Sequence, residues 1–452
     1  MKKIIFFLAS IIAALTFVSE ASALPLFARQ TGMECSACHF QHFPLLTSFG
    51  RAFKSNAYTM MGTQGKVEGD RLSIPNTLNM AALTTFGYEK TNSTPSQSPQ
   101  QNTGNGITYT PGHNGELSLF FGGRVNDNAG FLTEVGMIGP VDQSSAKMPI
   151  LFEVEAGTRV GIVPFSTNGQ GASYGFEVLN TGANAVHQMS GTGGFNSAHS
   201  NAISAQQYIG TGIAATGVAF VVNNPGYFIN VTKYNQLGTG DFGAAGGGLD
   251  STYLRVAGIF DVAGWDTGVG IQSWSGSSLT PPQAAVCTVD TTLLPSSVSP
   301  VTCTTPPAAL ATTKATAIDG QMQGELGKMP VGFYASYARA PYDAVVANTY
   351  NIMGGTLTRS SFNVSGEVGV LPGIATLGAA IRRAKSGVAD TTTGANETDN
   401  AIYLTATYKL SQNMMASLSY TANSGSYWSA NNSANTQAIG SKTTTINLFT
   451  LF

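Results

Sequence analysis

The stretch SFNVSGEVGV at residues 361–370 gives the clearest indication of the fold class. Phe362 and Val364 fall on one parity, with Val368 and Val370 continuing it. The polar side chains of Ser361, Asn363, Ser365 and Glu367 fall on the other. Successive side chains of a β-strand point to opposite faces, so one face of this segment suits lipid and the other suits water. The stretch therefore predicts a strand of an outer-membrane antiparallel β-barrel.

The same alternation recurs along most of the chain. Residues 402–410 and 415–421 alternate on either side of a tight turn at 411–413, which is typical of a hairpin. Other predicted strands are 116–125, 129–138, 150–160, 213–222, 227–234, 253–260, 319–327 and 332–339, with 173–179 and 376–381 less regular. Strands of roughly ten residues, joined by short turns and long loops, give an all-β barrel of about 16 strands over residues 70–452.

The composition supports a barrel in a membrane. Charged residues make up 10% of the chain, against about 25% in an ordinary soluble domain. The last residues end an alternating segment on Phe452, which resembles the assembly signal of bacterial outer-membrane barrels. A soluble β-sandwich is the alternative, because alternation alone does not identify the solvent on the apolar face. The formal charge of -2 offers no basic stripe for nucleic acid.

The first residues are typical of an export signal. Lys2 and Lys3 precede an apolar run at 4–18, and small residues follow at 21–23. This apolar run is shorter than the roughly 20 residues that cross a bilayer. We expect residues 1–23 to be a signal peptide that is cleaved during export to the outer membrane of a Gram-negative bacterium.

Residues 24–69 form a small segment with a cofactor motif. Cys35-Ser36-Ala37-Cys38-His39 has the Cys-x-x-Cys-His spacing of covalent c-type haem attachment. Two thiols can add to the two vinyl groups of one porphyrin while the adjacent imidazole binds the iron. A thioredoxin-like dithiol and half a zinc site are the alternatives, but the chain contains no second Cys-x-x-Cys. We therefore expect one haem c, with His39 as the proximal ligand.

The residues that complete the haem site are less well determined. Met60 or Met61 could supply the sixth iron ligand, and a thioether there would raise the reduction potential. The other candidates for the sixth ligand are Met33, His42, His113, His187 and His199. A sixth position without a protein ligand is also an alternative. Arg29, Arg51 and Lys54 could bind the haem propionates through charge-assisted hydrogen bonds. A short helix is expected from Pro44 to Lys54.

Two segments without strand character are expected to be long outer loops. They are residues 91–114 and 276–313, and both are rich in turn-forming residues. The second contains Cys287 and Cys303, which we expect to close a loop as a disulfide in an oxidising compartment. No histidine accompanies this pair, which argues against a metal site there.

The residues around the haem motif resemble one known family. PLFARQTGM at 25–33, CSACH at 35–39, Pro44, Leu46, FGR at 49–51, FK at 53–54 and YT at 58–59 are similar to the fused cytochrome-porins of iron-oxidising bacteria. The barrel half is similar only in general character. One departure is Asn56-Ala57, where the family usually has glycine.

The resemblance implies an Fe(II)-oxidising electron-transfer oxidoreductase. Extracellular Fe(II) would be the donor, and a periplasmic c-type cytochrome would accept the electron. Carboxylates on the polar parity could attract the cation; they are Glu134, Glu153, Glu155, Glu177, Asp319, Glu325 and Glu367. Two alternatives remain: a solute porin whose haem segment is a plug or sensor, and electron transfer from a donor other than iron.

Overall fold

The computed structural model describes most of the chain after the expected signal peptide. It covers residues 25–70, 72–91, 106–107, 117–137, 144–183, 204–236, 248–279, 286–289, 301–304, 310–351, 355–428 and 441–452. The expected signal peptide at 1–23 lies outside these residues. Within the described ranges, no helix has both the length and the apolar character needed to cross a membrane.

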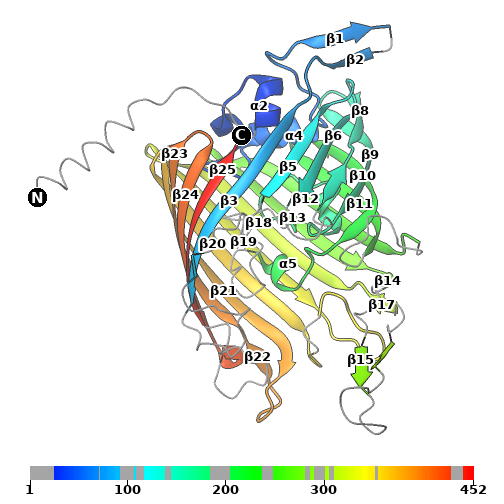
Figure 1. Cartoon of the computed structure of the whole chain (residues 1–452), viewed down its shortest axis with the longest axis vertical. Coiled ribbons are helices and arrows are strands. Elements are labelled where there is room, and N and C mark those ends of the chain that lie inside the picture. Colours follow the sequence, from blue (N-terminus) through cyan, green and yellow to red (C-terminus); the bar gives the residue numbers. More distant parts are fainter. Residues whose placement is uncertain are drawn as a thin grey trace, which may run out of the picture.

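The fold is a closed antiparallel β-barrel (Figure 1). In the described part of the chain, nineteen strand segments occupy sixteen positions, because β4, β7 and β22 share positions with β5, β8 and β23. The segments are β3 Met80–Thr91, β4 Gly106–Ile107, β5 Leu117–Arg124, β6 Gly130–Gly136, β7 Ser145–Lys147, β8 Ile150–Glu155, β9 Thr158–Thr167, β10 Ala215–Asn224, β11 Tyr227–Gln236, β12 Ser251–Val262, β13 Trp265–Ser275, β18 Ala315–Leu326, β19 Met329–Ala340, β20 Arg359–Leu371, β21 Ala375–Ala389, β22 Asn396–Thr398, β23 Asn400–Ser411, β24 Met414–Ser424 and β25 Lys442–Leu451. Pairing of β25 with β3 closes the barrel.

The alternation predicted from the sequence is confirmed in β20. Phe362 and Val364 point outward and are 48% and 41% exposed, whereas Asn363 and Glu367 point inward and are 1% and 3% exposed. The barrel therefore presents apolar side chains to its surroundings and polar ones to its lumen. The predicted fold class, an all-β barrel of about sixteen strands, is confirmed.

Three local predictions were wrong. Residues 150–160 are two strands, because the chain reverses at Gly157, whose φ of +76° is readily adopted by glycine. Residues 173–179 are not a strand but a 3₁₀ turn, η2 Ala172–Tyr174, followed by irregular chain. The segment 276–313 contains short strands at each end and in a central hairpin; those described are β14 Ser277–Leu279, β15 Val286–Val289, β16 Val301–Thr304 and β17 Leu310–Thr312.

The two ends of the barrel differ. Tight turns such as Gln412-Asn413 and Pro372-Gly373 lie at the end that also carries the chain's C-terminus, and the long connections lie at the other end (Figure 1). The N-terminal segment, defined here as residues 25–62, lies at the short-turn end. It contains α2 Pro25–Thr31, α3 Cys35–Cys38 and α4 Ser48–Ser55.

A separate hairpin connects the N-terminal segment to the barrel. Its strands are β1 Lys66–Gly69 and β2 Leu72–Pro75, and they pair only with each other. The sequence division at residue 69 therefore falls inside this hairpin, and the barrel itself begins with β3. The hairpin projects from the short-turn end of the molecule (Figure 1).

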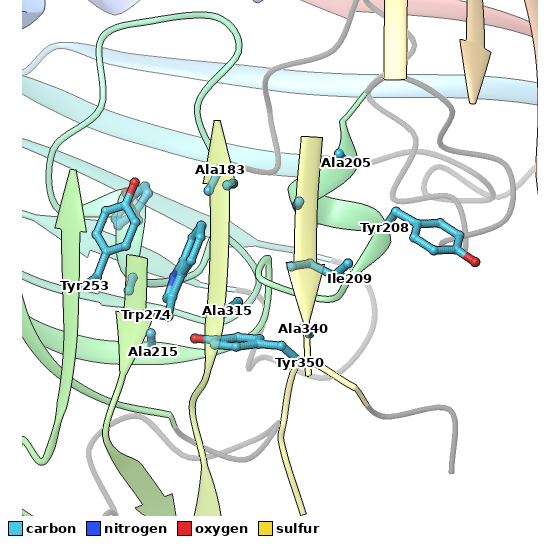
Figure 2. Packing of buried hydrophobic residues seen from close by; sticks show 14 of the residues in the cluster. Ala183, Ala205, Tyr208, Ile209, Ala215, Tyr253, Trp274, Ala315, Ala340 and Tyr350 are labelled. Atoms are coloured by element: carbon cyan, nitrogen blue, oxygen red, sulfur yellow. The ribbon is translucent and has the colours of Figure 1, made fainter. Parts of the chain in front are cut away.

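A second segment fills the lumen from within. The inward loop, residues 168–214 between β9 and β10, is described at 168–183 and 204–214 and includes α5 Ala205–Tyr208. Leu179, Ala205 and Ile209 are each 0% exposed. Ala205, Tyr208 and Ile209 of this loop belong to one buried cluster with Trp274 and Tyr350 of the rest of the molecule, and Figure 2 shows Ala205 and Ile209 on the same side of the view as Tyr208. The core of the molecule is thus the contact between this loop and the lumen-facing wall.

Candidate haem site

The motif cysteines lie on a short helix held tightly against a second helix. α3 spans Cys35–Cys38, and a Cβ added to Gly50 of α4 would lie 2.1 Å from the Cys38 carbonyl oxygen. Only glycine allows this approach. The Thr47 hydroxyl caps α4 by accepting a hydrogen bond from the Gly50 amide. The helix therefore starts at Ser48, and the prediction that Pro44 begins it was wrong, because Pro44 lies in the turn before this cap.

His39 is oriented as an iron ligand needs to be. Its Nδ1 lies 3.2 Å from the Leu45 carbonyl oxygen, so Nδ1 carries the proton and Nε2 carries the free lone pair. Burial lowers the pKa of the imidazole to about 4. His39 is therefore neutral near pH 7, which is the protonation state that binds iron.

The two thiols are not activated nucleophiles. Cys35 and Cys38 are free and half-buried. Burial raises the pKa of the Cys35 thiol to about 11, against an opposing effect of the Lys409 charge, and burial also raises the pKa of Cys38. Reactive dithiols have lowered pKa values instead. The donor set of two thiols and one oriented imidazole fits covalent haem attachment better than a redox dithiol.

The barrel wall forms the other side of this site. A cavity of about 30 Å³ is bordered by Cys35 and His39 on one side and by the β23–β24 turn on the other. The Cys35 Sγ lies 3.6 Å from the Gln412 carbonyl oxygen. The barrel residues that line the cavity are Lys409, Ser411, Gln412, Asn413, Met414, Met415, Phe449 and Leu451. A porphyrin is much larger than this cavity, so these residues would line only part of the space that a bound haem occupies.

Two of the three cations expected at the propionates have other partners. Arg29 donates to the Met80 carbonyl, and Arg51 forms an ion pair of 2.5 Å with Asp266. Lys54 is buried, which lowers its pKa to about 8 against the opposing charge of Glu177. None of the three lines the cavity beside Cys35 and His39. The cation that lines it is Lys409 of β23, which the sequence analysis did not connect with the motif.

Arg51 belongs to a different opening. It borders a cavity of about 620 Å³ between the outer face of α4 and several tight turns of the barrel, including Pro225 and Asp261. The assignment of Arg51 to haem propionates remains a prediction.

The N-terminal segment is docked into the lumen by polar contacts. The Nε2 of His42 lies 2.6 Å from a carboxylate oxygen of Glu367, and its Nδ1 lies 3.0 Å from the Phe43 carbonyl oxygen. Asn180 of the inward loop accepts from the Leu46 amide at 2.7 Å and donates to the Leu46 carbonyl at 3.1 Å. The inward loop and the N-terminal segment are therefore joined directly.

The candidate sixth ligands differ in their position relative to the cavity beside His39. Both ring nitrogens of His42 are engaged, and the residue is 1% exposed. Met60 and Met61 are half-buried, and neither lines the cavity beside His39, whereas Met414 and Met415 do. Met33 is 37% exposed. His113, His187 and His199 lie outside the described residues.

The departure from the family pattern occurs at a strained backbone position. Ala57 and Tyr58 have φ values of +55° and +59°. This left-handed conformation favours glycine, so a glycine here would relieve strain. The Ala57 carbonyl also packs against Gly130 of β6, where an added Cβ would lie 1.9 Å from its oxygen. The tight turn after α4 thus sets the segment against the barrel wall.

Most of the carboxylates expected to line the lumen are either paired or lie elsewhere. Arg255 lies between Glu177, at 3.0 Å, and Asp319, at 2.6 Å, and all three side chains are 0% exposed. Glu153, Glu155 and Glu325 share the parity of the lumen-facing residues of β8 and β18, but they are exposed at the rim beside the tight turns. Within the described ranges, no group of three or more His, Cys, Asp or Glu side chains is arranged as metal ligands would be.

The second cysteine pair lies in the outer hairpin. The register of β15 and β16 places Cys287 opposite Cys303. Their side chains lie outside the described part of the structure, so the disulfide between them remains a prediction.

Comparisons with known proteins give fold-level matches. No family model and no curated protein matches the chain. Among solved structures, Salmonella typhi OmpF in complex with daunomycin is 12% identical with a TM-score of 0.48, and the match covers 86% of this chain and 100% of that one. Outer-membrane expressed OmpT of Vibrio cholerae is 11% identical with a TM-score of 0.47, over 86% and 100%. The anion-selective porin from Comamonas acidovorans is 11% identical with a TM-score of 0.42, over 83% and 99%. Because these scores are below 0.5, the barrel assignment rests on the strand pairing of this chain itself.

Proposed function

We propose that this chain is an outer-membrane c-type cytochrome that takes one electron from extracellular Fe(II) and passes it to a periplasmic c-type cytochrome. The observation that carries the cytochrome assignment is the orientation of His39. Its Nδ1 is fixed by the Leu45 carbonyl, directly after two half-buried thiols on α3. The choice of iron as donor rests on the resemblance of residues 25–59 to fused cytochrome-porins.

The apolar exterior supports placement in the outer membrane. Outward side chains such as Phe333, Ile402 and Leu404 are 49–50% exposed in the isolated chain, and a lipid environment would cover them. In outer-membrane barrels the short turns face the periplasm and the long loops face outward. In that orientation the N-terminal segment lies at the periplasmic mouth, where a soluble acceptor can approach the haem.

This position sets a requirement on the donor. An apolar band of roughly 25 Å separates the exterior from the periplasm. Fe(II) would therefore have to approach from the long-loop side, because Cys35 and His39 lie at the opposite end. A haem held by Cys35, Cys38 and His39 would supply a one-electron acceptor, which matches the single electron that Fe(II) gives up on becoming Fe(III). No proton has to move in this exchange.

The first experiment tests the cofactor. The purified full-length protein should show haem staining that survives denaturing electrophoresis. The double variant Cys35→Ala with Cys38→Ala should lose this staining, because no thioether can form, whereas Cys303→Ser is a control that should keep it. Unchanged staining in the double variant would show that this motif does not hold the haem.

The second experiment tests the donor. Anaerobic Fe(II) is mixed with the oxidised protein in detergent, and the haem spectrum is followed. Reduction by Fe(II) supports the proposal. If the haem stays oxidised while a strong chemical reductant still reduces it, iron is not the donor.

A solute porin with a haem-bearing plug is the second candidate. The lumen-facing rows of β20 and β23 are polar, with Asn363, Thr405 and Thr407 among them, which is typical of porin walls. Single-channel conductance in planar bilayers separates the two functions. A steady conductance typical of open porins favours the porin, whereas a closed lumen favours electron transfer.

A further inference from the structure

We propose that Met415, the second residue of β24, supplies the sixth ligand to the haem iron that His39 binds. This inference rests on the proposed cytochrome function and deepens it. It assigns part of the haem site to the barrel, whereas the sequence pointed to Met60 or Met61.

The cavity beside the motif brings Met415 to the site. Cys35, His39 and Met415 all line it. On the barrel side, Met415 pairs in register with Phe449 of β25, and the Phe449 ring stacks with Phe43 at a centroid distance of 5.4 Å. The Phe43 ring in turn lies 5.1 Å from the His39 ring. A continuous set of side chains therefore links the proximal histidine to this thioether.

Strand parity separates Met415 from its neighbour. Met415, Ser417 and Ser419 are 4–7% exposed and face the lumen, whereas Leu418 is 49% exposed and faces outward. Met414 shares the parity of Leu418. Met415 is therefore the methionine of this pair whose side chain points toward the N-terminal segment.

The other donors at the cavity are less suited. His42 already uses both ring nitrogens, for Phe43 and for Glu367. Lys409 also faces the cavity, but a protonated ammonium has no lone pair and suits a propionate instead. A neutral thioether binds haem iron without releasing a proton, and its softness favours the ferrous state, which raises the reduction potential.

The test compares four volume-conserving variants in the full-length protein with its haem attached. Met415→Leu should abolish the long-wavelength charge-transfer band of sulfur-ligated ferric haem and should lower the reduction potential, with haem staining retained. Met414→Leu, Met60→Leu and Met61→Leu are matched controls that should keep the wild-type spectrum and potential. Heat-modifiable migration of each variant checks that the barrel is folded.

A ligand substitution makes the result independent of local packing. Met415→His should restore a six-coordinate spectrum, now of the bis-imidazole type, with a potential below that of the wild type. The inference is overturned if the wild-type protein lacks the sulfur band, if Met415→Leu leaves the band intact, or if a control variant loses it. Absence of haem staining in the wild type would instead defeat the proposed cytochrome function, so the two failures are distinguishable.

Discussion

Two segments fill the lumen of this barrel, and they are held there in different ways. The inward loop is fixed by fully buried charge, with Arg255 between Glu177 and Asp319. The N-terminal segment is attached by dispersed contacts, among them His42 to Glu367, Leu46 to Asn180 and Arg51 to Asp266. Its two thiols are half-buried and border a cavity. The segment with the cofactor motif therefore rests on separate contacts, one of which joins it to the inward loop.

This difference suggests that the inward loop has a structural role, whereas the N-terminal segment carries the residues for chemistry. A buried ion network is costly to break, because removing one partner leaves an uncompensated charge in a poorly solvated place. Such a network suits a permanent filling of the lumen. A segment that carries a covalent porphyrin, as we propose, would need contacts that leave its two thiols accessible. Three substitutions test this distinction.

The largest effect is expected from Arg255→Ala. Loss of the guanidinium leaves the buried carboxylates of Glu177 and Asp319 without their cation, which should destabilise the inward loop by about 3–5 kcal/mol. Single-channel conductance should rise, and the midpoint of heat-modifiable migration should fall. Arg159→Ala is the control, because its ion pair with Glu153 is partly exposed and is worth about 0–1 kcal/mol. If Arg255→Ala and Arg159→Ala had equal effects, the buried ion network would contribute no more to stability than the partly exposed pair.

An intermediate effect is expected from Glu367→Gln. Burial lowers the pKa of His42, but the charge of Glu367 and its hydrogen bond raise it further, so the net pKa lies above the ordinary 6.5. The contact therefore stabilises docking fully below pH 6.5 and is lost as the pH rises through the raised pKa. The variant should lose about 2–3 kcal/mol of docking free energy at low pH.

Hydrogen exchange of residues 40–62 as a function of pH measures this contact. The wild type should exchange faster above neutral pH, and Glu367→Gln should exchange fast throughout. Ser365→Ala, on the same lumen face of β20, is the control and should behave as the wild type. A wild-type profile that is flat with pH would show that the His42 contact does not hold the segment.

The smallest effect is expected from Asn180→Ala. Two neutral hydrogen bonds to Leu46 are lost, each worth about 1 kcal/mol. A double-mutant cycle of Asn180→Ala with Glu367→Gln measures whether the two attachments act together. Additive effects on hydrogen exchange would mean that the inward loop does not support the N-terminal segment.

The barrel could be predicted from the sequence because its signal is local. Each strand carries its own alternation, as residues 361–370 illustrate, and the low charge identified the solvent on the apolar face. The inward loop was missed for the complementary reason. Its residues are buried among other side chains on every side, so Ser173 to Leu179 carry no regular alternation and resembled a weak strand.

The candidate haem site likewise has a local part, which the sequence predicts, and a non-local part, which it does not. Cys35, Cys38 and His39 form a local motif that the sequence identifies. Lys409 and Met415 reach the same cavity only because barrel closure places β23 and β24 beside the N-terminal segment; Gln412 is 377 residues from the Cys35 that it contacts. No spacing rule covers such a distance. Arg29, Arg51 and Lys54 are close in sequence to the motif, but Arg29 and Arg51 contact Met80 and Asp266, and none of the three lines the cavity.

The contact between Cys35 and the β23–β24 turn joins two distant parts of the chain in one site. The carbonyl oxygen of Gln412, in the turn before β24, lies 3.6 Å from the Cys35 Sγ, and β25 follows to close the barrel on β3. The site beside His39 is therefore complete only when the C-terminal strands are in place. A chain truncated before β23 would keep the Cys-x-x-Cys-His motif but would lose Lys409, Met415 and Phe449 from the cavity lining.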